Sequence, residues 1–181
     1  MSQSSDTVLV IDIGNTNTVF GVYRNGSLLN HWRLSTALNK TVDEYAILLN
    51  SLIHFEKIKL ADIKHAIISC VVPPLLFAFQ KVCRKYIGIE PLVVEPGIKT
   101  GMPILYENPQ EVGADRIVDA AAVQQPYSGP ACGVDFGTAT TFDAINAAGD
   151  YLGGAIAPGI NIAAEALFLR TAKLPRGDLQ R

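Results

Sequence analysis

Cysteine and histidine are scarce in this chain of 181 residues, and both are dispersed along it. The three cysteines, Cys70, Cys83 and Cys132, form neither a disulfide framework nor a Cys-x-x-Cys metal pair. The three histidines are scattered in the same way. The sequence therefore excludes a disulfide-stabilised scaffold, argues against a zinc site and fits a reducing cytosol.

Long apolar runs and strong net charge are also missing. The longest apolar stretch, residues 66–79, is interrupted by two prolines and is shorter than the roughly 18 residues that a membrane helix needs. The first residues are polar and lack the pattern of a signal peptide. The formal net charge of −2 does not indicate binding to nucleic acid or to an anionic membrane. We therefore expect a soluble, cytoplasmic protein without nucleic-acid or membrane partners.

The two commonest nucleotide-binding motifs are absent, and a repeat stands in their place. The chain contains neither G-x-x-x-x-G-K-[ST] nor a G-x-G-x-x-G after a strand. Residues 8–18 and 131–141 instead share one pattern: an apolar run, then Asp-x-Gly, then a cluster rich in Thr or Asn. A supersecondary unit used twice is a strong indicator of fold.

Each copy of the repeat predicts a buried strand, a tight turn and a returning strand. Asp12 and Asp135 would lie at strand ends beside backbone N–H groups and hydroxyls, where they can hold a hydrated cation and a phosphate. Asp-x-Gly is also common in ordinary turns without a ligand, and for either copy alone that interpretation is favoured. Two matching copies favour a pair of phosphate hairpins that grip a nucleotide triphosphate from both sides.

The segments between the copies predict an α/β fold. Strands are expected near residues 8–13, 18–23 and 28–34, a helix after the capping box Thr41–Glu44, and a strand over 66–72. A helix then runs from Pro73 towards Gly88, and a further strand covers 91–94. This order implies a mixed sheet covered by helices.

The second copy is expected to resemble the first only in part. A helix over 111–123 precedes it, and a return strand over 140–146 and a third strand to Ile156 follow the Asp-x-Gly. A glycine-rich bend over 153–159 then leads to a helix near 162–169. The later strand–helix units of the first copy have no counterpart here, so we expect a fragment with an apparently truncated second domain. The predicted domains cover residues 7–110 and 111–181.

A third constellation, Gly113-Ala114-Asp115-Arg116, opens the helix before the second copy. The carboxylate could accept a hydroxyl proton while the arginine binds an anionic substrate group. The same residues could equally be a helix cap and a solvated face. Tyr106, on the preceding loop, could line the same pocket or be an ordinary surface aromatic.

Together these motifs closely resemble the type III pantothenate kinases, a family of the superfamily that includes acetate and sugar kinases and actin. The resemblance rests on the segments 12–17, 113–116, 135–140 and 153–159, which occur in the family's order. It implies duplicated actin-like ATPase (ribonuclease H-like) domains with mixed five-stranded sheets. It also implies a homodimer that phosphorylates pantothenate with ATP, the first step of coenzyme A biosynthesis.

The resemblance assigns roles to individual residues. Asp12 would lie near Mg²⁺, Asp135 would hold a monovalent cation (K⁺ or NH₄⁺), and Asp115 would accept the proton. The residues implied for ATP are Asp12, Ile13, Gly14, Asn15, Thr16, Asn17, Thr18, Val19 and Thr138. Those implied for pantothenate are Tyr106, Gly113, Ala114, Asp115 and Arg116.

Two other functions remain open. A non-catalytic regulatory or transcription-accessory relative could keep the same fold, and a phosphatase or sugar kinase could share it as well. A binding module has no need for Asp12, Asp115, Asp135 and Thr138 together, so their joint presence favours the kinase.

Overall fold

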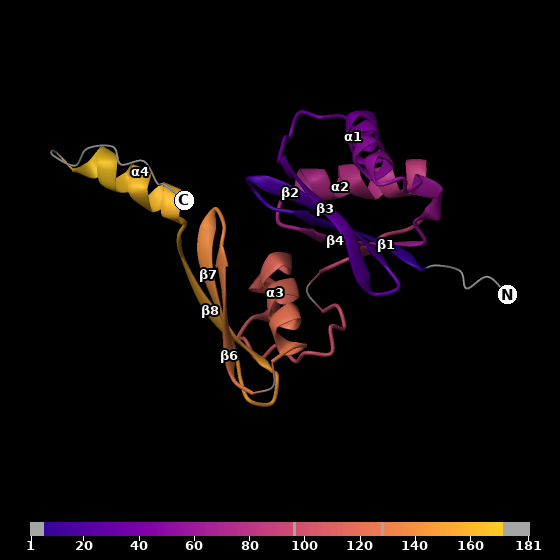
Figure 1. Ribbon diagram of the computed structural model, residues 1–181. Coiled ribbons are helices and arrows are strands. Elements are labelled where there is room, and N and C mark those ends of the chain that lie inside the picture. The colour runs from indigo at the N-terminus through magenta and orange to yellow at the C-terminus, as the bar shows by residue number, and fades with distance from the viewer. Residues whose placement is uncertain (1–5, 96, 128, 172–181) are drawn as a thin grey trace. The chain divides into compact units, whose positions relative to one another are not determined.

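The computed structural model describes residues 6–95, 97–127 and 129–171, and the chain divides into two compact units, Met1–Glu95 and Pro96–Arg181 (Figure 1). This division after Glu95 differs from the predicted one, which followed residue 110. Pro96 and residues 172–181 of the predicted domains lie outside the described residues. Within the described residues, no helix has the length and apolar character needed to cross a membrane.

The first unit is built on a mixed five-stranded sheet, as expected. The strand order is β3-β2-β1-β4-β5, with β1–β2 and β2–β3 antiparallel and β1–β4 and β4–β5 parallel. The strands are β1 Thr7–Ile13, β2 Asn17–Arg24, β3 Ser27–Ser35, β4 His65–Cys70 and β5 Leu92–Val93. This sheet confirms the predicted fold class for the first copy of the repeat.

Two helices accompany this sheet, and their ends follow the predicted signals. Helix α1, Val42–Phe55, begins with a capping box in which Thr41 N donates to Glu44 Oε2 (2.7 Å) and Glu44 N to Thr41 Oγ1 (3.3 Å). Helix α2, Pro73–Val82, continues into a π-helical turn, Cys83–Ile87. Gly88 ends that turn at a φ of 81°, a conformation that glycine adopts without steric cost.

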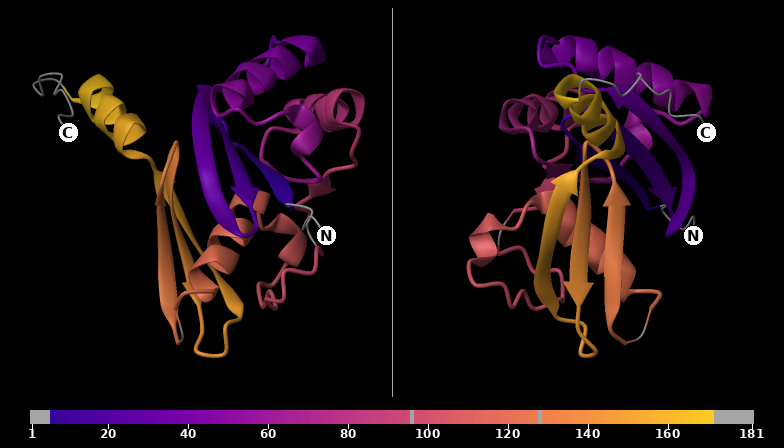
Figure 2. Two further views of the ribbon diagram at one scale, coloured as in Figure 1. Left: turned by 45° about the vertical axis from the view of Figure 1, so that its right-hand side comes forward. Right: turned by 90° about the vertical axis from the view of Figure 1, so that its left-hand side faces the viewer.

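Both helices pack on one face of the sheet (Figure 2). The ring of Phe79 in α2 lies 5.6 Å from that of Phe20 in β2 and 4.5 Å from that of Tyr45 in α1, measured between centroids. Alternate residues of β1, including Leu9 and Ile11, are fully buried in the same cluster. Because strand side chains alternate between faces, the residues between them point away from the helices.

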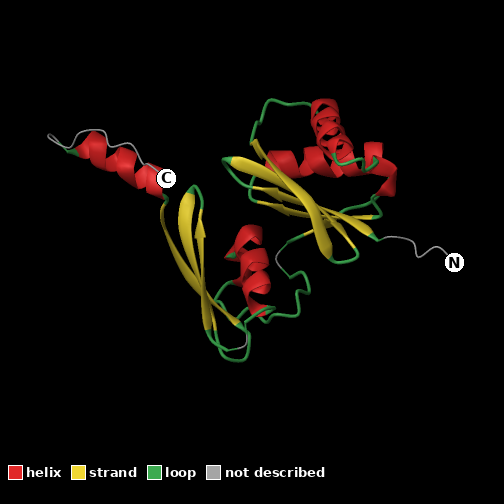
Figure 3. Ribbon diagram, in the orientation of Figure 1, coloured by secondary structure: helices red, strands yellow, loops and turns green. Residues whose placement is uncertain are grey.

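The second unit contains a three-stranded antiparallel sheet in the order β6-β7-β8 (Figure 3). Its elements are α3 Ala114–Gln124, β6 Ala131–Phe136, β7 Ala139–Ile145, β8 Tyr151–Pro158 and α4 Ile160–Arg170. The described residues therefore show three of the five strands expected for a whole copy. The predicted third strand to Ile156 is confirmed as β8, which continues to Pro158. The glycine-rich bend predicted over 153–159 is wrong, because residues 153–158 pair with β7 as part of that strand.

Helix α3 covers one face of the second sheet. A Cβ added to Gly133 of β6 would lie 3.4 Å from Val123 of α3, and Asp143 of β7 pairs with Gly133 on this face. The opposite face carries exposed apolar side chains, including Val134 and Phe142. Apolar surface of this kind commonly marks an interaction site.

The loop before α3 belongs to the second unit because it is bonded to β8. Tyr151 N donates to Pro103 O (2.9 Å), and Leu105 N donates to Tyr151 O (2.8 Å). Next to them, the ring of Tyr106 lies where a side chain at Gly153 would be, since an added Cβ would come within 2.7 Å of the ring. These contacts explain why the boundary between the units precedes the loop and does not follow it.

The Phe79 contacts predict a large difference between two phenylalanines of one helix. Phe79→Ala should lower the free energy of unfolding by about 3–5 kcal/mol, because it leaves a cavity among fully buried side chains. Phe77, 58% exposed and 4.4 Å from Lys81 Nζ, should cost about 1 kcal/mol or less when changed to alanine. Urea unfolding of both variants measures the difference. Equal losses would contradict this packing of α2.

A second prediction concerns the contact between Gly153 and Tyr106. Gly153 and Gly129 both have φ above 100°, but only Gly153 has a neighbour within 4 Å of an added Cβ. Gly129→Ala should therefore show the backbone strain alone, about 1–2 kcal/mol. Gly153→Ala should cost about 1–3 kcal/mol more, since overpacking adds to the strain. Thermal unfolding should show that Tyr106→Ala removes this excess, and an unchanged excess would contradict the contact.

Candidate functional site

The first Asp-Gly segment forms a tight hairpin between β1 and β2. Ile13 pairs with Thr18, and Gly14 N donates to Asn17 O (2.9 Å) across the turn. Thr36, just after β3, holds the turn from outside, because its hydroxyl donates to Gly14 O (2.7 Å) and lies 3.1 Å from Thr18 Oγ1. Thr36 was not among the predicted site residues, because only the pairing of β3 with β2 brings it to the hairpin.

Burial separates the eight residues of this hairpin into three groups. Ile13 and Thr18 are buried, so their side chains serve the core and only their backbone groups can face a ligand. Asn15 and Thr16 are exposed at the tip. The remaining four, Asp12, Gly14, Asn17 and Val19, are half-buried. The exposed tip and its backbone therefore form the part of the hairpin that can reach a phosphate.

Asp12 lies on the face of the sheet that points away from α1 and α2, next to two residues of β4. Its register partner is Ser69, whose hydroxyl is buried and has no hydrogen-bond partner among the described residues. Burial raises the pKa of the neighbouring Cys70 thiol, and the charge of Asp12 raises it further. A thiol kept protonated is a poor nucleophile, so this end of β4 offers a hydroxyl and not a reactive cysteine.

The second Asp-Gly segment forms a hairpin of a slightly different shape. Phe136 pairs with Thr140, which leaves three residues in the turn, whereas four separate Ile13 from Thr18. Gly137 N donates to Ala139 O (2.9 Å). The side chains of Asp135 and Thr138 are exposed, and Asp135 pairs with Thr141 on the face that α3 covers. The two copies thus share a design but not an identical turn.

Helix α4 begins directly against this second hairpin. Gly159, the residue before the helix, donates its N–H to Thr138 O (3.1 Å). A Cβ at Gly159 would collide with that oxygen and would lie 2.5 Å from Gly137 O. Only glycine allows this approach, so the last glycine of the 153–159 motif fixes the start of α4 to the hairpin.

The Gly113–Arg116 segment begins α3, as predicted. Asp115 Oδ1 accepts a hydrogen bond from Arg116 N (2.8 Å), as a first-turn carboxylate does when it satisfies an unpaired helix N–H. A Cβ at Gly113 would lie 2.5 Å from the same carboxylate oxygen. The capping interpretation of Asp115 therefore has direct support, and the half-buried carboxylate remains at the helix start, where an incoming hydroxyl could meet it.

Arg116 is not part of a solvated face, which was one of the two interpretations left open. Its Nε and Nη2 lie 2.8 Å and 2.7 Å from Asp143 Oδ1, and Nη2 also donates to Phe142 O (3.1 Å). The side chains of Arg116 and Asp143 are only 14% and 3% exposed. Tyr151 donates its hydroxyl to the same oxygen of Asp143 (2.8 Å). Burial and this carboxylate together raise the pKa of Tyr151 well above its ordinary value.

The second unit thus brings together several of the residues singled out from sequence. Tyr106 and Arg116 lie against neighbouring glycines of β8, Gly153 and Gly154. Asp115 is next to Arg116 in the sequence. Asp135 lies on the α3 face of β6, two residues along the strand from Gly133, which pairs with Asp143. Asp12 and the rest of the first hairpin belong to the other unit.

Two residues of this cluster, Asp143 and Tyr151, were not predicted, and their positions in the sequence are informative to different degrees. Asp143 is a charged residue at a core-facing position of an alternating strand, and burial of an unpaired charge is costly. That position required a cationic partner, which Arg116 provides. Tyr151 gave no comparable signal.

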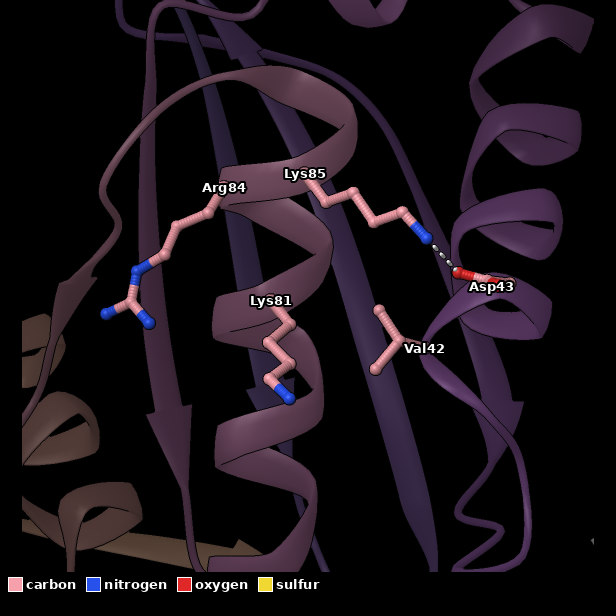
Figure 4. A pocket seen from close by; sticks show the side chains of 5 residues that line it. All are labelled: Val42, Asp43, Lys81, Arg84 and Lys85. Carbon is pink, nitrogen blue, oxygen red and sulfur yellow. Dashed lines mark hydrogen bonds and ion pairs between the residues drawn. The ribbon is translucent and has the colours of Figure 1, made fainter.

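A hollow of about 510 Å³ in the first unit contains none of these residues (Figure 4). Lys85 Nζ lies 2.8 Å from Asp43 Oδ1, a contact that holds the pKa of Asp43 below its ordinary value, and Arg84 is paired with Glu90 at 2.6 Å. These side chains are exposed, and two of the three cations are neutralised locally. The lining residues are Val42, Asp43, Lys81, Arg84 and Lys85. The hollow is best described as a solvated ion-pair surface.

Among the described residues, no group of three or more His, Cys, Asp or Glu side chains could hold a metal ion. Mg²⁺ that travels with a nucleotide needs only one or two carboxylates, since phosphates and water complete its coordination. Asp12, beside the backbone of a tight turn, fits this mode of binding.

Comparison with solved structures shows the fold. A protein assigned to the Baf family of transcriptional activators, from Campylobacter jejuni, aligns with a TM-score of 0.54 at 22% identity, over 91% of this chain and 61% of its own. The Ppx/GppA phosphatase of Aquifex aeolicus aligns with a TM-score of 0.53 at 16% identity, over 90% of this chain and 55% of its own. At these identities the likeness extends to the fold alone.

Comparison with curated sequences goes further. A type III pantothenate kinase of Syntrophus aciditrophicus is 57% identical over 93% of this chain and 66% of its own length. One of Bacillus cytotoxicus is 54% identical over 96% of this chain and 66% of its own. The chain thus spans about two thirds of the length of these relatives. The family model for type III pantothenate kinases matches residues 8–181, and the chain belongs to that family.

Proposed function

We propose that the protein carrying this chain transfers the γ-phosphate of ATP to pantothenate, giving 4′-phosphopantothenate in the first step of coenzyme A biosynthesis. The proposal is supported by relatives of this name at more than 50% identity. The structural observation that supports it best lies at the start of α3, where the Asp115 carboxylate is next to the Arg116 guanidinium, which is held in place.

The first hairpin would bind the phosphates of ATP. Backbone N–H groups at the exposed tip, with the Thr16 hydroxyl and the Asn15 amide, are suited to phosphate oxygens. The proposed ATP contacts are Asp12, Ile13, Gly14, Asn15, Thr16, Asn17, Thr18 and Val19, with Thr138 from the second hairpin. Asp12 would lie near the Mg²⁺ that the phosphates bind, and the ion would neutralise charge on the transferred group.

Pantothenate would bind at the start of α3. Asp115 would accept the proton of the reacting hydroxyl, a role that needs a positioned carboxylate and no covalent step. Arg116 would bind the carboxylate at the other end of the substrate. Gly113, Ala114 and Tyr106 would complete the contacts.

Asp135 would hold a monovalent cation, K⁺ or NH₄⁺. Its carboxylate is exposed beside the turn at Gly137, where the carbonyl groups of Gly137 and Thr138 also lie. Oxygen donors of this kind suit a hard monovalent ion. The cation would offset part of the phosphate charge.

A regulatory protein without catalysis is not favoured. The likeness to the Campylobacter jejuni protein is 22% in sequence and extends to the fold only, whereas the kinase relatives exceed 50% identity. We also propose that the protein is a homodimer located in the cytoplasm, in keeping with the family resemblance.

The catalytic assignment predicts the effect of Asp115→Asn. The wild-type protein should release ADP only when both ATP and pantothenate are present, measured in a coupled assay. Asp115→Asn should lower kcat by about 10²–10⁴-fold with a melting temperature near that of the wild type, because the amide cannot accept the proton. Asp150→Asn, in the β7–β8 turn, is the matched control and should retain activity. Pantothenate-independent ADP release would contradict the proposed function, and an active Asp115→Asn variant would remove Asp115 from its role.

The cation assignment predicts that K⁺ or NH₄⁺ is required in addition to Mg²⁺. Na⁺ should substitute poorly, because its smaller radius does not match oxygen donors spaced for K⁺. Asp135→Ala should raise the K⁺ concentration needed for half-maximal activity. Rates measured in matched chloride buffers test this, and equal rates in K⁺ and Na⁺ would reject the assignment.

A further inference from the structure

The guanidinium of Arg116 and the carboxylate of Asp143 form the buried ion pair of the second unit. Three donors converge on Asp143 Oδ1: Arg116 Nε at 2.8 Å, Arg116 Nη2 at 2.7 Å and the Tyr151 hydroxyl at 2.8 Å. The Asp143 side chain is 3% exposed. A carboxylate this deeply buried interacts with ligands through its partner and not directly.

The pair restricts which N–H groups of Arg116 can bind a substrate. Of the five N–H donors of a guanidinium, Nε provides one and each terminal nitrogen two. The Nε donor points to Asp143, and the two of Nη2 reach Asp143 and Phe142 O. Among the hydrogen bonds of the described residues, Nη1 makes none. Its two N–H groups are therefore the ones left for an anionic ligand.

Strand β8 has a glycine where the Arg116 guanidinium lies against it. A Cβ at Gly154 of β8 would collide with both Arg116 Nη2 and Phe142 O, so no side chain fits beneath the guanidinium. The Arg116 Cζ lies 6.0 Å from the centre of the Tyr151 ring. Bare backbone on one side and an aromatic ring nearby hold the plane of the guanidinium.

We propose that Asp143 is a positioning residue for the kinase reaction, which fixes Arg116 so that Nη1 alone receives the carboxylate of pantothenate. Tyr151 supports it by donating to the same oxygen. This inference rests on the proposed function. It adds that recognition of the anionic end of the substrate depends on a buried carboxylate that the substrate never touches.

The physical reason is preorganisation. An unrestrained arginine would lose rotamer entropy when it binds a carboxylate, whereas Arg116 is already held. Asp143 also offsets part of the arginine's positive charge, which weakens long-range attraction of anions. The arrangement therefore favours one geometry of binding over general affinity for anions.

A double-mutant cycle tests the proposal in the whole protein. Asp143→Asn and Arg116→Gln, singly and together, are compared by steady-state ADP release. Each single change should lower kcat/KM for pantothenate about tenfold or more, the loss expected for a charge-assisted hydrogen bond, and leave KM for ATP within about twofold. The double variant should match Arg116→Gln alone, because Asp143 acts only through Arg116. Additive losses would overturn the proposal.

A change of substrate separates positioning from a purely structural role. Pantothenyl alcohol keeps the reacting hydroxyl and carries a hydroxymethyl group in place of the carboxylate. The penalty of Asp143→Asn should largely disappear with this substrate, whereas a general loss of structure would reduce both rates alike. Asp150→Asn, the same substitution in the turn of the same hairpin, is the control and should discriminate between the two substrates as the wild type does.

Tyr151→Phe keeps the inference testable if Asp143→Asn does not fold. It removes one of the three donors to Asp143 and should give a smaller loss of the same kind, confined to the carboxylate substrate and absent in the Arg116→Gln background. An equal loss with both substrates would overturn the proposal. A wild-type protein without pantothenate-dependent ADP release would instead refute the proposed function and this inference with it, whereas active wild type with additive variants refutes the inference alone.

Discussion

The alternation of side chains along two strands is the constraint on which the candidate site depends. In β1 the residues that face α1 and α2 form the core, so Asp12 between Ile11 and Ile13 must point to the other face. In β7 the same alternation turns Asp143 towards α3. A shift of register by one residue would bury Asp12 among apolar side chains, which its charge forbids. The alternation that packs the core therefore also determines on which face of each sheet the carboxylates lie.

The buried pair of Arg116 and Asp143 follows from the same constraint in the second unit. Removing one partner of a buried ion pair typically costs about 3–5 kcal/mol, because the other charge is left without compensation. A pair of well-packed apolar residues would avoid that cost, so stability alone does not account for these two side chains. The half-exposed position of Asp115 beside the pair, at the start of α3, connects the charge to the proposed chemistry.

Local sequence signals predicted much of the fold. Contacts between segments that are distant in the sequence explain the features that were not predicted. The capping box at Thr41 and the left-handed Gly88 act within a few residues, and both helix ends were found from sequence. Gly153 and Gly154 were expected in a strand and also at the start of a bend, and only the strand is present. These positions lack side chains because Tyr106 and Arg116, from distant segments, occupy the space beside them. The domain boundary was displaced for a similar reason, since hydrogen bonds to Tyr151 are invisible in the loop's own sequence.

The two hairpins differ in turn length and in the segment that supports each turn. The first turn holds four residues and is braced by the hydroxyl of Thr36, which comes from the end of the adjoining strand β3. The second holds three and is braced by the backbone of Gly159 at the start of α4. The two copies therefore differ in the segment that supports each turn and share the Asp-x-Gly sequence.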